Sequence, residues 1–147
     1  MVAIIPFPYE ESDALSWLES QEPMRLAGDG LDLAVVHAET DSVLGAIGIG
    51  TVSAILRSAS MGYWLAQEAR GQGYMTAAAR VLARWAFDDL GMARLELTTD
   101  PHNVPSQRIA ERCGFQREGY LRSHMLILHS GERRDSLIYG LLPEDLL

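Results

Sequence analysis

The chain has 147 residues, of which 48% are hydrophobic and 22% are charged, and its formal net charge is -8. This length predicts one domain over residues 1–147, and the composition is that of a globular protein rather than a disordered one. No apolar run approaches the ~20 residues of a transmembrane helix. The apolar segment Met1–Tyr9 lacks the basic leader of a secretion signal. We therefore expect no membrane partner.

The rare residue types narrow the function further. The single cysteine, Cys113, excludes an internal disulfide and a cysteine-based metal site, and it suits a reducing cytoplasm. The four histidines are scattered without a paired carboxylate motif, so we expect no metal. Nucleic acid is an unexpected partner, because phosphate backbones are bound by basic stripes. Residues 1–60 carry nine acids against two arginines, a balance that would attract a cationic amine.

The first half of the chain predicts one helix and three strands. The helix is expected over Ser12–Glu22, with Pro23 beyond its end. Its apolar members are Leu15, Trp17 and Leu18. Two strands follow over Leu31–Ala38 and Val43–Gly50, joined by a hairpin connection, and a third is expected over Met61–Leu65. Three glycines in the second strand indicate bulging or close backbone contact, namely Gly45, Gly48 and Gly50.

The second half opens with the most regular pattern of the chain. Apolar residues recur at helical spacing over Tyr74–Leu90, and Gly91 is a natural stop. The elements expected after it are a strand over Arg94–Thr99, a helix from the N-cap Asn103 to Cys113, and an antiparallel hairpin of two strands over Leu121–Leu128 and Asp135–Leu142.

This order of elements predicts an α/β (α+β) fold, with a mixed central β-sheet flanked by helices. The strand–helix–strand unit from Met61 to Thr99 should place its strands parallel, through a right-handed crossover. The loop at the carboxyl end of the first strand in such a unit is where a ligand is expected.

That loop contains two glycines, in the run Arg70-Gly71-Gln72-Gly73-Tyr74-Met75. Glycine at a strand-to-helix junction permits a sharp bend and close approach of a ligand. The helix that follows points unpaired N–H groups and its positive dipole end at the loop, which favours an anion such as phosphate. The alternative is an ordinary turn. A dinucleotide pattern fails at Thr76, and a P-loop is excluded because the chain has no lysine.

Several spaced motifs surround this loop. Arg70, Gly73 and Met75 occupy the key positions of the pattern Arg/Gln-x-x-Gly-x-Gly/Ala. The other matching features are the strand Gly62 to Leu65, the pair Asn103 and Ser106, the dipeptide Gly114-Phe115, and the closing run Asp135 to Tyr139. Together these features resemble the GNAT-type N-acetyltransferases, most closely the RimJ/RimL-like branch, over about residues 30–142.

The resemblance implies a GNAT-like sheet and transfer of an acetyl group from acetyl-CoA to a primary amine, either a protein N-terminal α-amine or a small-molecule amine. It implies Ser106 as the catalytic group near the thiol, Asn103 as a residue that orients the pantetheine, and the backbone of Leu65 as an oxyanion contact. The implied cofactor-binding residues are Leu65, Arg70, Gly71, Gln72, Gly73, Tyr74, Met75 and Asn103.

Three departures from the family pattern leave questions open. Met75 stands where Gly or Ala is usual, and the usual N-terminal strand and helix are shortened into Met1–Tyr9. Ser60 stands where relatives often carry Glu. The candidates for the general base are therefore Glu68, Glu96, His124 and Asp135. Two alternatives to an enzyme follow: a non-catalytic acyl-CoA-binding or regulatory module, and a homodimeric interaction protein that uses an exposed sheet edge.

Overall fold

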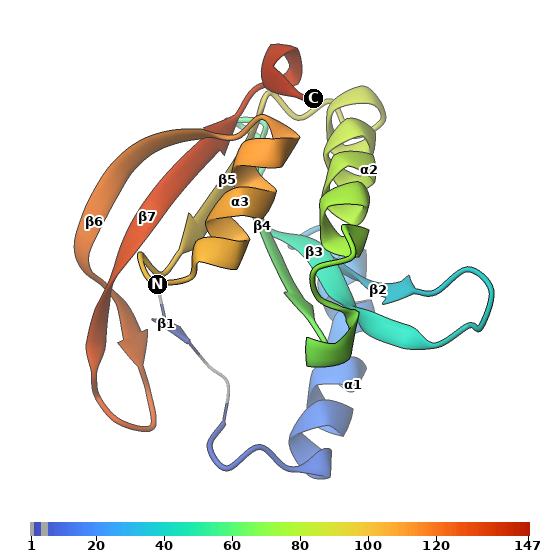
Figure 1. Cartoon of the computed structure of the whole chain (residues 1–147), viewed down its shortest axis with the longest axis vertical. Helices are drawn as coiled ribbons and strands as arrows, with labels where there is room; N and C mark the ends of the chain where they lie inside the picture. The colour runs from blue at the N-terminus through green and yellow to red at the C-terminus, as the bar shows by residue number, and fades with distance from the viewer. Residues whose placement is uncertain (1, 4–5) are drawn as a thin grey trace.

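The computed structural model describes residues 2–3 and 6–147, and its strands form one mixed sheet (Figure 1). Within the described residues the sheet has seven strands in the order β1-β6-β7-β5-β4-β3-β2. The elements are β1 (Val2–Ala3), α1 (Glu11–Ala27), β2 (Leu31–Val36), β3 (Val43–Ser53), β4 (Ser58–Leu65), α2 (Tyr74–Asp88), β5 (Arg94–Thr99), α3 (Val104–Cys113), β6 (Gln116–Ile127) and β7 (Arg133–Leu141), with short 3-10 turns at Gln67–Ala69 and Pro143–Asp145.

The arrangement confirms the predicted fold class. β4 and β5 are parallel and are joined through α2, whereas β2–β3, β3–β4, β5–β7 and β6–β7 are antiparallel. α2 and α3 lie side by side over one face of the sheet, and both helices start at the same end of the molecule (Figure 1). The two helices therefore direct their N-termini toward one region.

The N-terminal segment adds a strand at the other edge of the sheet. β1 runs parallel to β6, with Val2 opposite Leu126 and Ala3 opposite Ile127. The prediction of a shortened strand and helix over Met1–Tyr9 falls partly on Met1, Ile4 and Ile5, which lie outside the described residues.

The first helix is longer than predicted. Pro23 was expected beyond its end, but it lies inside α1, which continues to Ala27 and ends at Gly28 with φ 76°. Proline removes one backbone donor, so the carbonyl four residues earlier, in Glu19, loses its helical partner. Glu19 is exposed, and water can hydrogen-bond that carbonyl, so the helix persists.

The apolar residues of α1 remain at the surface. None of its described side chains is buried, and Leu15, Trp17 and Leu18 are 54%, 41% and 57% exposed. Leu15 and Leu18 are three residues apart and share a face, whereas Trp17 lies about 100° from Leu18 around the helix. One packing contact could therefore not bury all three side chains.

The core lies between the sheet and the α2–α3 pair. α2 buries a single apolar face, made of Met75, Ala79, Leu82, Ala83, Ala86 and Phe87. The alternation in β5 places Leu95 and Leu97 inward, at 0% and 3% exposure, as predicted. No helix within the described residues is long and apolar enough to cross a membrane.

β4 and β5 separate before they end. Their paired residues run only from Ser58–Arg94 to Ser60–Glu96, although β4 continues to Leu65 and β5 to Thr99. We call the region beyond Ser60 and Glu96 the β4–β5 splay. It opens a gap in the centre of the sheet, at the end where α2 and α3 begin.

Close backbone contact in β3, which the glycines predict, is confirmed at Gly45. A methyl group there would clash with the carbonyl oxygen of Trp64 and lie 2.9 Å from the Cα atom of Leu65. Both atoms belong to the backbone of β4 and have no rotamer through which to move away. At Gly50 the nearest atom, Ser60 Oγ, would be 3.8 Å away, an ordinary contact.

We predict that Gly45→Ala lowers the free energy of unfolding by roughly 1–3 kcal/mol, because β3 must move away from β4. The matched control on the same strand, Gly50→Ala, should stay within about 0.5 kcal/mol of the unsubstituted protein. Urea unfolding of both variants measures the difference. Equal stability of the two variants would contradict the close approach at Gly45.

Candidate active site

The loop before α2 has the backbone conformation that its glycines predict. Gly71 and Gly73 have φ values of 78° and 85°, in the left-handed region that glycine adopts most easily. Gly73 is the N-cap of α2 and provides no side-chain cap. The first N–H groups of an α-helix have no partner within the helix. Those of Tyr74, Met75 and Thr76 are therefore available to an anion at the positive end of α2.

Met75 is compatible with this arrangement. Its side chain is 2% exposed and packs in the core beneath α2, so it points away from the loop. Its backbone is helical, so its amide is one of the unpaired N–H groups in the first turn of α2. Methionine is therefore tolerated at this position, where the family usually has Gly or Ala, because its side chain is buried in the core.

Arg70 binds the protein's own backbone. Its Nε donates to the carbonyl oxygen of Leu65 at 3.0 Å, and Gln72 Nε2 donates to the Glu68 carbonyl at 3.3 Å. Both side chains are exposed. The Arg70 bond attaches the loop to the end of β4, and the Gln72 bond joins two residues within the loop. The remaining nitrogens of the Arg70 guanidinium are free to meet a ligand.

The backbone of Leu65 faces the β4–β5 splay. Ala66 N donates to Leu44 O at 2.8 Å, which makes this a hydrogen-bonded position of the β3–β4 ladder. Hydrogen-bonded and non-hydrogen-bonded pairs alternate in an antiparallel ladder, so the next pair, Gly45 and Leu65, is non-hydrogen-bonded. The Leu65 N–H accordingly points away from β3, toward the gap that β5 has left.

Asn103 and Ser106 begin α3 on the other side of the gap. Asn103 is the N-cap, and its Oδ1 accepts a hydrogen bond from Ser106 N at 3.3 Å. Ser106 is half-buried in the first turn. The capping bond therefore fixes the orientation of this turn, and it occupies the Asn103 side-chain oxygen.

The structure adds Tyr63, which the sequence did not single out. Its hydroxyl lies 3.0 Å from Ser106 Oγ and 3.2 Å from the Ser106 carbonyl oxygen. Burial raises the pKa of Tyr63 to about 12. Tyr63 belongs to the strand Gly62 to Leu65, so alternation along β4 could have placed it on the same face as Met61 and Leu65. No pattern in the sequence indicates that Tyr63 contacts Ser106 on α3.

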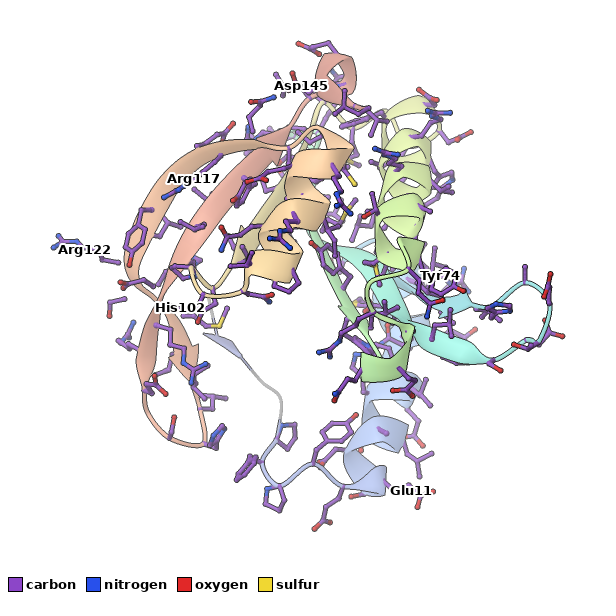
Figure 2. All side chains as sticks on the ribbon, viewed as in Figure 1. Glu11, Tyr74, His102, Arg117, Arg122 and Asp145 are labelled. Atoms are coloured by element: carbon purple, nitrogen blue, oxygen red, sulfur yellow. The ribbon has the colours of Figure 1, made fainter. Side chains whose placement is uncertain are left out.

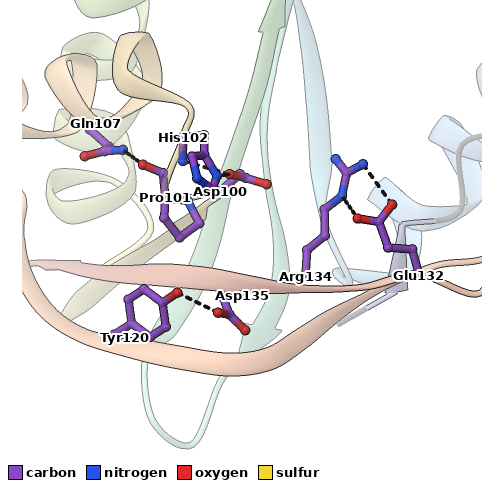
Figure 3. A network of polar contacts seen from close by, with 8 residues as sticks. All are labelled: Asp100, Pro101, His102, Gln107, Tyr120, Glu132, Arg134 and Asp135. Atoms are coloured by element: carbon purple, nitrogen blue, oxygen red, sulfur yellow. Dashed lines mark hydrogen bonds and ion pairs between the residues drawn. The ribbon is translucent and has the colours of Figure 1, made fainter.

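A polar cavity of about 690 Å³ lies beside the start of α3. It is lined by Asp100, Pro101, His102, Asn103, Tyr120, Glu132, Arg133, Arg134 and Asp135. Figure 3 shows its polar contacts: Arg134 pairs with Glu132 at 3.0 Å, and His102 Nδ1 lies 3.1 Å from Asp100 Oδ1. In Figure 2, His102 lies just before α3, and Tyr74 lies at the start of α2. Asn103 belongs to both the cavity and the cap of α3.

The four candidate bases have different surroundings. Glu96 is ion-paired with Arg94 at 3.0 Å, and Glu68 lies in the exposed turn after β4. His124 lies 3.1 Å from Ser136 Oγ, and burial lowers its pKa, which favours the neutral imidazole that a base requires. Asp135 lines the cavity and accepts hydrogen bonds that lower its pKa. The structure brings only Asp135 of these four into the cavity beside Asn103.

Two further features bear on the chemistry of the site: the contact of Ser60 and the arrangement of side chains that could bind a metal. Ser60 Oγ donates to the Gly50 carbonyl at 2.9 Å, a contact between β4 and β3. Among residues 2–3 and 6–147, no group of three or more His, Cys, Asp or Glu side chains is arranged to hold a metal ion.

The geometry combines an uncapped helix N-terminus after two left-handed glycines, an open strand splay and a hydroxyl at the start of a second helix. The model of the acetyltransferase (GNAT) domain matches residues 1–116. The chain belongs to this family. The sequence-based resemblance to its RimJ/RimL-like branch is likewise confirmed by the relatives described next.

Curated relatives include YdaF of Bacillus subtilis, named provisionally as a ribosomal N-acetyltransferase. It is 34% identical over 104 residues, which make up 71% of this chain and 56% of YdaF. The [ribosomal protein uS5]-alanine N-acetyltransferase of Escherichia coli is 29% identical over 67% of this chain and 52% of its own length. The chain thus spans little more than half the length of these two relatives.

Solved GNAT structures superpose closely on this fold. RimJ of Mycobacterium smegmatis, solved with CoA-disulfide, has a TM-score of 0.82 at 29% identity, over 92% of this chain and 63% of RimJ. The Microcin C7 self-immunity acetyltransferase MccE, solved with acetyl-CoA and AMP, has a TM-score of 0.83 at 26% identity, over 92% of this chain and 73% of MccE.

We predict that Tyr120→Phe raises the pKa of Asp135. The Tyr120 hydroxyl and the Ser123 amide, at 2.6 Å, donate to this carboxylate and hold its pKa below the ordinary value of 3.8. A depressed folded pKa stabilises the protein above the unfolded pKa, and this contribution is lost as the pH falls through the folded pKa. The variant should therefore be less stable than the unsubstituted protein at neutral pH, and the two stabilities should converge in acid.

Carboxyl-carbon NMR of Asp135 during a pH titration measures this shift directly. Tyr9→Phe, at an exposed position outside the cavity, is the control and should leave the Asp135 titration in place. An Asp135 pKa that is the same in the Tyr120→Phe variant as in the unsubstituted protein would contradict the hydrogen-bond assignment.

Proposed function

We propose that the chain is an acetyl-CoA-dependent N-acetyltransferase that acts on a primary amine. The observation that carries this proposal is the convergence of two features on one gap in the sheet. The uncapped start of α2, after Gly71 and Gly73, can bind a pyrophosphate, and the β4–β5 splay can admit an extended chain beside the Leu65 backbone. Family membership and the CoA-bound neighbours support the same ligand.

The residues present fit acetyl-CoA. A side chain at Gly71 or Gly73 would meet no atom of the protein within 4 Å, so the space above both glycines is open to a ligand. The amides of Gly73, Tyr74 and Met75 would hold the pyrophosphate, with Gln72 and a free nitrogen of Arg70 at its edge. Acetyl-CoA supplies a thioester, which is an activated acyl group with a thiol leaving group.

The chain's own groups then stabilise the charges that develop. The Leu65 N–H, which points into the splay, would donate to the thioester oxygen as negative charge accumulates on it. Ser106 would donate to the departing sulfur. In the overall reaction the amine nitrogen gains the acetyl group and loses a proton. The electron pair of the C–S bond leaves with sulfur, which gains a proton.

The acceptor class follows from the cost of deprotonating the amine. At pH 7 this costs about 4.6 kcal/mol for a lysine-like amine of pKa ~10.4, but only about 1 kcal/mol for an α-amine near 7.8. An α-amine therefore needs only a weak base, such as Asp135 acting through water. We propose a protein N-terminal α-amine as the acceptor, a choice that the name of the E. coli relative supports. Small-molecule amines are the second candidate.

A non-catalytic acyl-CoA-binding module is the alternative from another class. Ser60 favours such a module, because its hydroxyl donates to the Gly50 carbonyl and it provides no carboxylate at the position where relatives often carry Glu. Consumption of acetyl-CoA across a panel of N-terminal peptides and small amines separates enzyme from module. Homodimerisation and a cytoplasmic location, which the buried thiol of Cys113 suits, also stay predictions.

We predict that Gly73→Val abolishes CoA binding. Valine at φ 85° is strained by roughly 1–3 kcal/mol, and relief of this strain rotates the loop amides away from the pyrophosphate. Gly131→Val is the matched control, since Gly131 also has a positive φ, 68°, and open space around it but lies in the β6–β7 turn. Calorimetric titration with CoA should show binding to the control only. Equal affinities would mean that the loop is merely a turn.

We predict that Ser106→Ala lowers kcat by about tenfold to a hundredfold while the affinity for CoA stays nearly constant, because the hydroxyl acts only on the departing sulfur. Steady-state kinetics with the best amine, together with CoA titration, check both parts. An unchanged kcat would remove Ser106 from the mechanism.

A further inference from the structure

A second hydroxyl group lies directly behind Ser106. Tyr63 projects from β4 and meets Ser106 at the start of α3, a partner 43 positions away in the chain. The contact joins β4, beyond the last residue that pairs with β5, to the helix that follows β5. Tyr63 is partly buried and packs against the core formed by α2, α3 and the sheet, which restricts the motion of its ring. The Tyr63 hydroxyl can therefore restrain the Ser106 hydroxyl, whose side chain can otherwise rotate.

We propose that Tyr63 is a positioning residue, which holds the Ser106 hydroxyl so that its proton points into the splay. This inference rests on the proposed acetyl transfer and adds a residue to it. The phenol has one proton for two acceptors, the Ser106 carbonyl oxygen at 3.2 Å and Ser106 Oγ at 3.0 Å. When this proton is donated to Oγ, the one proton on Oγ is left for another acceptor. That acceptor would be the sulfur of CoA.

Without this contact Ser106 has a competing partner in its own helix. Serine in a helical turn readily donates to a backbone carbonyl three or four residues earlier. For Ser106 these carbonyls belong to Asn103 and His102. When the Tyr63 hydroxyl donates to Ser106 Oγ, it holds the serine side chain in a position that opposes a bond to the Asn103 or His102 carbonyl. Tyr63 thereby raises the fraction of molecules in which the Ser106 proton faces the splay.

Tyr63 acts as a neutral donor and transfers no proton itself. Its pKa, raised to about 12 by burial, lies well above that of a thiol near ~8.5, so the phenol stays protonated beside a thiolate. The groups that face it from neighbouring elements are Ser106, Cys113 and Tyr139. All three are uncharged at neutral pH, so no neighbouring charge changes the protonation state of the phenol.

The test is Tyr63→Phe, which keeps the ring and removes the hydroxyl. We expect kcat to fall about threefold to tenfold, while the KM for acetyl-CoA and the unfolding temperature change little. The thiol of bound CoA gives a readout that needs no turnover, because the ultraviolet absorbance of the thiolate reports its pKa in the complex. This pKa should rise by roughly 0.5 to 1 in Tyr63→Phe, as in Ser106→Ala.

Two comparisons separate positioning from a structural role. Tyr139→Phe removes a buried phenol from β7 that forms no hydrogen bond to Ser106 within the described residues, and it should leave kcat and the thiol pKa unchanged. The double variant Tyr63→Phe/Ser106→Ala should be no slower than Ser106→Ala alone. Additive losses, or a lower unfolding temperature with kcat and thiol pKa intact, would overturn the proposal.

Failure of the proposed function gives a different result. If no amine is acetylated but CoA binds, the acetyltransferase proposal fails, while the pKa of the bound thiol still tests Tyr63. If CoA does not bind to the unsubstituted protein at millimolar concentration, both proposals are overturned. If amines are acetylated and the thiol pKa is the same with and without the Tyr63 hydroxyl, only the positioning role is overturned.

Discussion

The separation of β4 from β5 beyond Ser60 and Glu96 is the constraint on which the rest of the site depends. Two adjacent parallel strands would normally continue to pair, and here they diverge while each keeps its outer neighbour, β3 or β7. The Leu65 amide, which points away from β3, faces this gap. The N-termini of α2 and α3 lie at the same end of the sheet (Figure 1), where an anionic, extended ligand would contact both.

A splay of this kind exposes backbone groups that must find other partners, since an unpaired buried donor costs about 1–3 kcal/mol. The structure satisfies one of them internally, because Arg70 Nε donates to the Leu65 carbonyl. The amides at the start of α2 have no side-chain cap. A ligand that brings phosphate oxygens to these amides therefore stabilises the fold and the complex together.

The sequence predicted α2, β5 and α3 nearly to the residue, because apolar periodicity, an N-cap and a terminal glycine all agree there. It failed at Pro23, since a proline inside a solvent-exposed helix can be tolerated when water binds the freed carbonyl. The loop and Ser106 were predicted from spaced motifs. The Tyr63–Ser106 contact was not predicted, because it joins segments 43 residues apart. The cavity was missed for the same reason, since it combines the β5–α3 loop with the β6–β7 hairpin.

Backbone amide NMR tests the central claim, pyrophosphate binding at the start of α2, most directly. CoA and inorganic pyrophosphate should both shift the amides of Gly73, Tyr74 and Met75. Pantetheine, which lacks the pyrophosphate, should instead shift the amide of Leu65 in the splay. Shifts confined to residues outside these two regions, with Gly73, Tyr74 and Met75 unaffected by CoA, would contradict the account.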